Sequence, residues 1–333
     1  MKKVILLLLS LFVLVAVSLL FAGCGREPQE SRVFRFACNL PDGHPSVVGA
    51  LAMASYVERR TNGILRIEVL NNAVLGDEFS NIGQTVFGEI DFTRAGLVTL
   101  ADINPMLSSL SIPFIFRDRE HKFRVLDGPI GQEFLESMTW RNLLGLTWLD
   151  GGFRNVYNSQ RIVRTPADLH GLRINVLGRA LMMDTIRLMG GLPALLPFGD
   201  IYQGLRNNVI EGAENNWHSY VSNAHYQAAR YITLTKHVAL PEMFLINARV
   251  WASLSLAQQR IIREGAREGA RVQRAEWLLA EQRYEAQARA SGNVITDLTL
   301  AERQLFIDAL SPLFSHISHY QFTPIVRRVM ETR

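Results

Sequence analysis

The strongest constraint on the fold of this chain is an alternation of strand and helix patterns that begins soon after an apolar N-terminus. Segments with apolar residues at every second position alternate with segments that carry a helical apolar stripe, and glycine or proline separates them. An order β-α-β-α-β places the strands parallel in one sheet with helices on its faces. The pattern predicts strands over 33–38, 64–70 and 89–93, and helices over 46–60 and 78–87.

A second set of such segments follows in the middle and last thirds of the chain. Proline and glycine punctuate it, while the longest helical pattern contains no proline. We expect strands over 143–149, 153–158, 172–176 and 244–248, and helices over 120–138, 180–189 and 254–290, with a short strand over 293–296 and two helices at the end.

The length of the chain indicates two domains, because 333 residues exceed what one hydrophobic core usually serves. We predict an α/β fold with two lobes. Lobe I comprises residues 33–150 plus 241–280, and lobe II comprises 151–240 plus 281–333. Ligands of open α/β sheets bind beyond the carboxyl ends of the strands, and pockets favour domain interfaces. The expected binding site is therefore a cleft between the lobes.

The N-terminus has the features of an export signal. Two lysines precede an apolar run over 4–22, and the tetrapeptide 21–24 ends in Cys24 after small residues, which resembles a bacterial lipobox. We predict that residues 1–23 form a lipoprotein signal peptide, that Cys24 is lipidated, and that 24–32 is a polar tether at the cell envelope. The alternative is an uncleaved anchor helix. With Cys24 lipidated, Cys38 has no partner for a disulfide.

The composition argues against a disordered chain and against a nucleic-acid-binding protein. The chain is 48% hydrophobic and 20% charged, which is ordinary for a globular protein and argues against disorder. The formal net charge of +4 falls to +2 without the two N-terminal lysines. So small an excess does not indicate nucleic-acid binding.

The sequence contains little that indicates catalysis. It has neither the Gly-x-Ser-x-Gly elbow of hydrolases nor a phosphate-binding loop that ends in Lys-Ser/Thr. His218 and His225, with Glu211 and Glu214 upstream, are the candidate metal ligands. Common zinc spacings are tighter, so hydrogen-bonded helix histidines are the favoured interpretation. We expect no catalytic residue, metal or cofactor. An exported metal-dependent enzyme is the alternative from another class.

Arginine is the usual partner of a ligand carboxylate, because its planar fork donates two parallel hydrogen bonds. Arg154 stands inside a predicted strand, where it either pairs with a carboxylate of the protein or points at a ligand. Arg94 ends a predicted strand at the expected cleft. The cluster 211–217 is polar and contains Asn215 and Trp217, which offer hydrogen bonds and a flat apolar face.

Seven segments, in their order and spacing, resemble the DctP-type solute receptors of tripartite ATP-independent periplasmic (TRAP) transporters. The resemblance covers nearly the whole chain after the signal region. It implies two hinged α/β lobes, a long helix that braces both, a bound organic acid, and membrane permease subunits as partners. The segments are NLPDGHP, TNGILRIEVLNNAVLGDE, GEIDFTRAG, IPFIFRDREH, TPADLHGLRINV, MGGLPALLPFGDIYQGLRNNVIEGAENNW and PEMFLIN.

The resemblance also implies roles for individual residues. Arg154 matches the first of two arginines that hold the substrate carboxylate, and Asn215 matches the asparagine that completes this site. Phe198 matches a pocket aromatic. Asn39 and Glu242 match positions that line the side of the first lobe.

Asn175 departs from the family pattern, since it stands where the most typical arginine of the family would be. Arg173 and Arg179 are the nearby candidates to replace that arginine. With Trp217 and the ENNW run, this departure leads us to expect a monocarboxylate or sugar acid and not a dicarboxylate. A receptor that signals to a sensor kinase is a further alternative.

Overall fold

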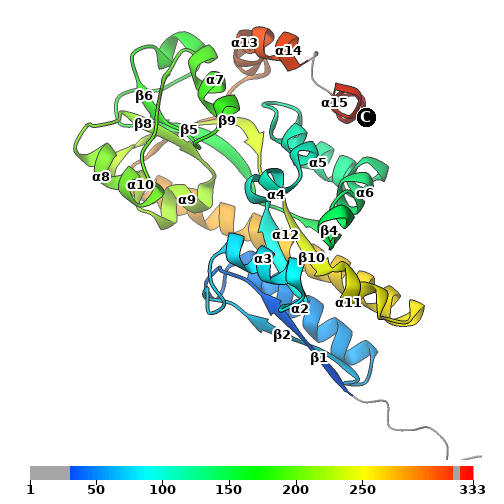
Figure 1. Cartoon of the computed structure of the whole chain (residues 1–333). Helices are drawn as coiled ribbons and strands as arrows, with labels where there is room; N and C mark the ends of the chain where they lie inside the picture. The colour runs from blue at the N-terminus through cyan, green and yellow to red at the C-terminus, as the bar shows by residue number, and fades with distance from the viewer. Residues whose placement is uncertain (1–30, 318–322, 333) are drawn as a thin grey trace, which may run out of the picture.

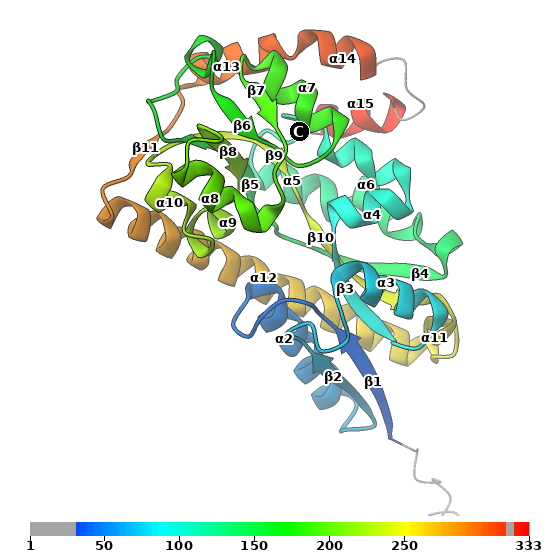
Figure 2. The ribbon, with the colours of Figure 1, turned by 60° about the vertical axis from the view of Figure 1, so that its left-hand side comes forward.

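The computed structural model describes residues 31–317 and 323–332. It contains two β-sheets, each with helices around it, and one long helix that runs along both lobes (Figure 1). Figure 2 shows the same two lobes from another side, with the long helix α12 running along both of them. The α/β architecture with two lobes agrees with the sequence prediction.

The first lobe is built on a five-stranded sheet of order β2-β1-β3-β10-β4. The first three strands are parallel, as the alternation of strands and helices predicts, while β10 runs antiparallel to both of its neighbours. The strands are β1 (Arg32–Ala37), β2 (Leu65–Leu70), β3 (Phe92–Gly96), β4 (Leu143–Leu149) and β10 (Glu242–Asn247). The strand expected over 89–93 begins later, because Gly88 ends the preceding helix in the left-handed conformation with φ of 83°.

The second lobe contains a six-stranded sheet of order β11-β9-β5-β8-β6-β7. β5 lies between β9 and β8 and is antiparallel to both, while β6 is parallel to β7 and β8. The strands are β5 (Phe153–Asn158), β6 (Arg173–Asn175), β7 (Leu192–Ala194), β8 (Gly212–Asn215), β9 (Tyr231–Ala239) and β11 (Val294–Thr296).

Helices cover both faces of the first sheet, and two apolar cores separate them from it. α2, α11 and the first part of α12 pack on one face, and the remaining helices of the lobe pack on the other. These elements are α2 (Pro45–Arg60), α3 (Glu78–Phe87), α4 (Leu97–Ile103), η1 (Pro105–Ser111), α5 (Arg119–Leu126), α6 (Pro129–Glu136), η2 (Thr139–Arg141) and α11 (Ala248–Ala252).

The helix predicted over 120–138 is in fact two helices, α5 and α6. Pro129 opens α6 as its first residue and lacks the N–H that a continuous helix would need. Gly131 lies so close to the end of α5 that a Cβ there would stand 1.8 Å from the Leu126 carbonyl oxygen. The chain therefore breaks at Asp127 and Gly128 and turns back on itself.

The second lobe is covered by shorter helices. Its apolar residues form two further clusters around β5, β6, β8 and β9. The helices are η3 (Pro166–Leu169), α7 (Ala180–Leu188), η4 (Phe198–Asp200), α8 (Ile201–Arg206), α9 (Trp217–Ser222), α10 (His225–Ala228), α13 (Leu300–Ala309) and α14 (Ser311–Ile317).

The long helix α12 (Leu256–Ala290) contacts both lobes, as the family resemblance implies. It packs against α2 of the first lobe and α9 of the second. The contact with α2 is close because it is made by glycines: a Cβ on Gly49 would lie 2.8 Å from the Gly269 carbonyl oxygen. Only residues without a side chain allow two helix backbones to approach so closely.

The last helix, α15 (Thr323–Glu331), contacts α6 and η1 of the first lobe. Its residues Ile325, Val326 and Val329 join the core of that lobe. The prediction placed all of 281–333 in the second lobe, whereas this segment returns to the first. The reason is an apolar stripe on α15 that is buried against the first lobe.

The N-terminal predictions fall outside the described residues. Residues 1–23, Cys24 and all but the last two residues of the tether 24–32 lie in the part of the chain before residue 31. Within the described ranges, no helix combines the length and the apolar character that crossing a membrane requires.

Candidate functional site

A cavity of about 480 Å³ lies between the two lobes. This volume is within the range of small-molecule pockets. The first lobe contributes Glu78, Arg94, Gly96, Leu97, Val98 and Glu242. The segments that cross between the lobes contribute Gly151 and Leu240, and the second lobe contributes Arg154, Asn175, Val176, Leu177, Gly178, Leu196, Phe198, Ile201, Glu214, Asn215, Asn216 and Ser219.

Strand ends from both sheets meet at this cavity. In the first sheet β3 ends at Gly96, and antiparallel β10 begins opposite it at Glu242. In the second sheet parallel strands β6 and β8 end at Asn175 and Asn215. The cavity therefore lies beyond the carboxyl ends of parallel strands and between two lobes, where ligands of α/β folds usually bind.

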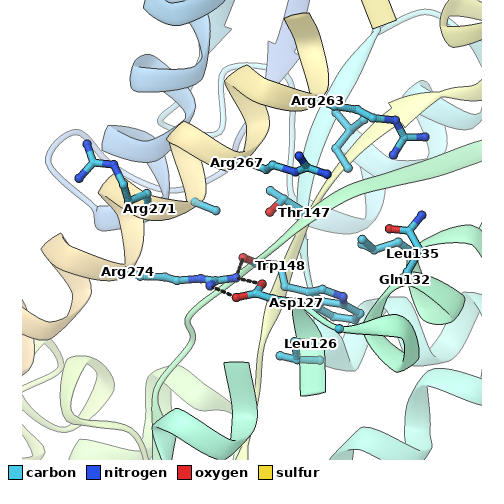
Figure 3. A pocket seen from close by; sticks show the side chains of 13 residues that line it. Leu126, Asp127, Gln132, Leu135, Thr147, Trp148, Arg263, Arg267, Arg271 and Arg274 are labelled. Atoms are coloured by element: carbon cyan, nitrogen blue, oxygen red, sulfur yellow. Dashed lines mark hydrogen bonds and ion pairs between the residues drawn. The ribbon is translucent and has the colours of Figure 1, made fainter. Parts of the chain in front are cut away.

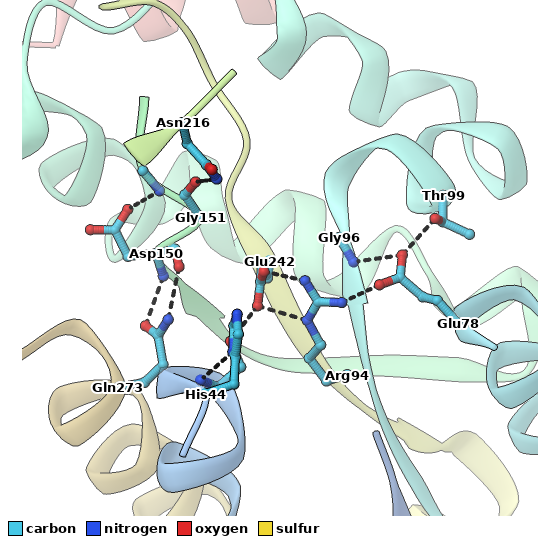
Figure 4. Close-up of polar contacts among 12 residues, drawn as sticks. His44, Glu78, Arg94, Gly96, Thr99, Asp150, Gly151, Asn216, Glu242 and Gln273 are labelled. Carbon is cyan, nitrogen blue, oxygen red and sulfur yellow. Dashed lines mark hydrogen bonds and ion pairs between the residues drawn. The ribbon is translucent and has the colours of Figure 1, made fainter. Parts of the chain in front are cut away.

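Arg94 is held between two carboxylates of the first lobe (Figure 4). Phe244 lies opposite Arg94 in the pair of β3 and β10, so Glu242, two residues along β10, projects from the same face. Arg94 Nε donates to Glu242 Oε2 at 2.7 Å, and Nη2 makes an ion pair with the same carboxylate. Arg94 Nη1 pairs with Glu78, which also accepts the Gly96 N–H at 3.1 Å.

Arg154 in the second lobe has the same kind of partner. Val156 lies opposite Glu214 in the pair of β5 and β8, so Arg154 is a diagonal neighbour of Glu214 on one face. Its Nη2 donates to Glu214 Oε1 at 2.8 Å and to the Glu214 carbonyl oxygen at 2.5 Å, while Nε pairs with Oε2. Nη1 donates to Asn215 Oδ1 at 3.1 Å. Of the two possibilities that the sequence left open, the structure shows a protein carboxylate beside this arginine.

Neighbouring charges shift the pKa values of two groups in the cavity, Glu214 and Arg94. Burial raises the pKa of Glu214, but Arg154 and His237 outweigh it and hold this pKa at about 2. His237 Nε2 lies 3.4 Å from Glu214 Oε2. Burial alone would lower the pKa of Arg94, yet Glu242 and Glu78 raise it above its ordinary value. Glu214 and Arg94 are therefore ionised at neutral pH.

The charges that line the cavity do not add up to an excess of cations. Two guanidinium groups, those of Arg94 and Arg154, face three carboxylates, those of Glu78, Glu214 and Glu242. All five groups are engaged with one another within their own lobe. A solute that enters here meets ion pairs that are already formed, and not free cations.

Asn175 lines the cavity, and neither of the nearby arginines replaces it there. Asn175 Oδ1 accepts the Leu196 N–H at 2.7 Å. Arg173 is exposed and pairs with Glu211, while Arg179 pairs with Asp102 of the first lobe. The place of the typical family arginine is thus occupied by a neutral amide whose oxygen is already bonded.

Six of the eight residues predicted to bind a ligand line the cavity, namely Arg94, Arg154, Asn175, Phe198, Asn215 and Glu242. Phe198 is about half exposed at 53%, which leaves its ring accessible. Trp217 is buried beside Tyr220 in an apolar cluster of the second lobe and does not line the cavity. Asn39 follows β1 and does not line the cavity either, although its Oδ1 is buried without a hydrogen-bond partner in the described part of the chain.

Sequence reasoning missed Glu78, Asn216 and Ser219 as lining residues. Glu78 lies in the first turn of α3, directly after the N-cap Asp77. Asn216 is the N-cap of α9 and donates from Nδ2 to the Gly151 carbonyl oxygen at 2.9 Å. A carboxylate or amide at a helix start beside a strand end was the available signal.

The candidate metal ligands are spread over several environments. His218 accepts or donates a hydrogen bond with Tyr284 at 2.9 Å, and buried His225 does the same with Tyr157 at 2.8 Å. Glu211 and Glu214 each pair with an arginine. Within residues 31–317 and 323–332 no three histidine, cysteine or acidic side chains converge as metal ligands would.

The comparison with protein families decides the class. The family model of the bacterial extracellular solute-binding proteins, family 7 (DctP), matches residues 36–320. The chain belongs to this family. Family 7 proteins are receptors that bind solutes outside the cytoplasm and are not enzymes. This confirms the prediction of a solute receptor and the prediction that the protein is not an enzyme.

Individual relatives agree with the family 7 assignment. A solute-binding protein of Chromohalobacter salexigens is 38% identical over 237 residues, covering 71% of this chain and 70% of the relative. The 2,3-diketo-L-gulonate-binding periplasmic protein YiaO of Escherichia coli is 30% identical over 266 residues, covering 79% and 80%. A TRAP periplasmic solute-binding protein of Chromohalobacter salexigens, solved with bound D-glucuronate, superposes with a TM-score of 0.81 at 32% identity and covers 90% of this chain and 100% of that structure.

Proposed function

We propose that this family 7 protein captures a monoanionic sugar acid of the uronate type and delivers it to the membrane subunits of a TRAP transporter. The observation that carries the proposal is the charge balance of the cavity, in which two arginines are already matched by three carboxylates. A second negative charge on the solute would find no cation to offset its desolvation. A relative that binds 2,3-diketo-L-gulonate and a structure with bound D-glucuronate support the same solute class.

One carboxylate can still be bound at the second lobe. A guanidinium group has five N–H donors, and the contacts of Arg154 with Glu214 and Asn215 use four of them. The remaining Nη1 donor, the amide nitrogen of Asn215 and the Ser219 hydroxyl are available to one carboxylate. Because Glu214 fixes the orientation of Arg154, this donor is positioned before the solute arrives.

The first lobe suits the other end of a sugar acid. Glu78 and Glu242 are carboxylates with oxygens that face the cavity, and such oxygens accept hydrogen bonds from hydroxyl groups. Arg94 retains two N–H groups that its ion pairs do not use. The exposed ring of Phe198 offers an apolar face to the carbon skeleton. Hydroxyls at one end and a single carboxylate at the other match this arrangement.

The proposal includes lobe closure and membrane attachment. The chain crosses between the sheets at 150–152 and near 240, where β4 leads to β5 and β9 leads to β10. We propose these crossings as the hinge between lobe I (33–150 plus 241–280, with α15 packed on it) and lobe II (151–240 plus 281–317). Lipidation at Cys24 would keep the receptor beside its permease at the outer face of the membrane.

Isothermal titration calorimetry with four solutes tests the proposal. D-glucuronate and D-galacturonate represent the predicted class, succinate has two carboxylates without hydroxyls, and D-glucose has hydroxyls without a carboxylate. We expect one of the two uronates to bind with at least about 100-fold higher affinity than succinate or glucose, which is about 2.8 kcal/mol. Tighter binding of succinate or glucose than of both uronates would refute the proposed solute class.

A further inference from the structure

A second cavity, of about 430 Å³, lies on the outer side of the first lobe, away from the lining of the cleft. It is a groove between α12 on one side and the turn between α5 and α6 on the other, with the edge strand β4 at its base (Figure 3). Leu126, Leu135 and Leu146 form an apolar floor. None of the residues that line the cleft lines this groove.

Four arginines of α12 stand along the groove, but two of them are neutralised. Arg274 pairs with Asp127 at 2.6 Å and also donates to the Trp148 carbonyl oxygen. Arg271 pairs with Glu268 at 2.7 Å, and Figure 3 shows it turned to the opposite side of the helix. These two arginines therefore add no unmatched charge to the groove.

Arg263 and Arg267 are different, because neither has an ion pair or a hydrogen bond within the described residues. Their spacing of four places them on one face of α12, and Figure 3 shows Arg267 beside Thr147 and Arg263 farther along the groove, towards Leu135. Arg263 is half-buried, with its guanidinium carbon 4.7 Å from the centre of the Trp251 ring. Burial and, next, the charge of Arg267 lower the pKa of Arg263, and the charge of Glu136 offsets this only in part.

Like charges on adjacent turns of a helix destabilise it, and a half-buried cation without a counter-ion is costly. Arg94, Arg119 and Arg154, by contrast, each have a carboxylate partner. The unmatched pair sits at a groove with an apolar floor and a few polar groups, which is the usual composition of a small-molecule site. The missing partner is a negatively charged molecule.

We propose that this groove is a second anion-binding site, in which Arg263 and Arg267 together bind a small dianion such as a phosphate group or a dicarboxylate. Its solute differs from that of the cleft, where every arginine is already paired. Gln132 on α6 and Thr147 on β4 face the same space and can donate to the oxygens of the anion. The number of unmatched cations, two, sets the charge of the ligand.

Calorimetric titration of the purified protein with inorganic phosphate, and separately with succinate, tests the site. The decisive variant is Arg263→Gln with Arg267→Gln. The matched control is Arg283→Gln with Arg289→Gln, which removes the same charge from exposed positions of α12 that do not line the groove. We expect the control to bind like the wild type and the groove variant to bind at least about tenfold more weakly. Arg263→Lys, which keeps the charge, should retain most of the affinity.

Thermal unfolding separates a lost site from a damaged fold. Without anion the groove variant should unfold at the same temperature as the wild type or higher, because it has lost a like-charge repulsion. Phosphate or succinate should raise the unfolding temperature of the wild type and the control only. If the groove variant loses only the stabilisation by phosphate, the site binds phosphate groups. If it loses the stabilisation by both anions, the site binds dianions in general. Absence of binding to the wild type, or equal loss in both double variants, would overturn the proposal.

Discussion

His44 and His218 face each other across the boundary between the two lobes, with their ring centroids 4.9 Å apart. His44 belongs to the first lobe, where its Nδ1 accepts the Ser46 N–H at 3.1 Å and caps α2. His218 lies in α9 of the second lobe. Trp277 of α12 packs against both rings, at 5.8 and 6.3 Å. Two titratable rings, buried His44 and half-buried His218, thus lie at the joint between the lobes and the helix that braces them.

This pair predicts that acid weakens the fold. Burial, and then the charges of His218 and Arg94, lower the pKa of His44 from 6.5 to about 3. Because the folded state binds this proton less readily than the unfolded state, the stabilising contribution is complete above about pH 6.5 and is lost as the pH falls towards 3. We expect the free energy of unfolding to fall by up to about 1.4 kcal/mol per pH unit for this group, as measured by urea denaturation between pH 7 and 4.

His44→Asn is the matched control for this effect, because asparagine also caps helices but does not titrate. The free energy of unfolding of this variant should depend less steeply on pH, by the amount that about one proton accounts for. Some pH dependence should remain, because burial lowers the pKa of His225 to about 4 as well. An unchanged slope in His44→Asn would contradict the assignment to His44.

Arg154→Ala should destabilise the protein by about 3–5 kcal/mol, because it leaves Glu214 buried without its main cation. The double variant Arg154→Met with Glu214→Leu removes the pair as a unit and should recover most of this loss. Urea denaturation measures the stability, and titration with D-glucuronate measures binding. We expect the double variant to fold and still bind at least about tenfold more weakly. Wild-type affinity in that variant would show that Arg154 serves the fold alone.

Asn175→Arg should change the solute preference. The new side chain would add a cation to a cavity whose arginines are outnumbered by carboxylates. We expect the affinity for succinate to rise at least about tenfold while that for D-glucose stays the same. Asn175→Lys is a useful comparison, because lysine lacks the planar fork that binds a carboxylate at two points. If neither substitution alters the ranking of solutes, Asn175 does not govern charge selectivity.

Gly151→Ala should damage the hinge, since a Cβ at this position would stand 1.9 Å from the Leu240 carbonyl oxygen. The two crossing segments would have to separate, and we expect a loss of at least about 2 kcal/mol in the free energy of unfolding. Gly83→Ala is the control, because nothing lies within 4 Å of a Cβ there and α3 should gain up to about 1 kcal/mol. Equal stabilities of the two variants would argue against close packing at the crossing.

Mass spectrometry of the protein isolated from membranes tests the N-terminal prediction. The expected species begins at Cys24 and carries an acyl mass. Cys24→Ser should release the receptor from the membrane fraction without changing solute affinity. Recovery of residues 1–23 at the N-terminus of the mature protein would contradict this prediction.

The sequence determined the elements and the class of fold. Periods of two and 3.6 residues reflect which side of a strand or helix is buried, so they identify segments such as β5 and α12 from neighbours in the chain alone. The cleft followed from the order of those elements, because the ends of parallel strands share one edge. Two predictions of the fold were wrong. The segment of α5 and α6 was predicted as one helix, but a turn divides it. The segment of α15 was placed in the second lobe, but it packs on the core of the first.

The tertiary structure alone decided what the arginines do. In the sequence, Arg154 and Glu214 are 60 residues apart, and Arg94 and Glu242 are 148 residues apart. The pairing of β5 with β8 makes Arg154 and Glu214 diagonal neighbours. The pairing of β3 with β10 does the same for Arg94 and Glu242. An ion pair depends on distance in space, which no local pattern records. A single chain could therefore indicate that Arg154 is in the site, but not that a carboxylate of the protein already holds it.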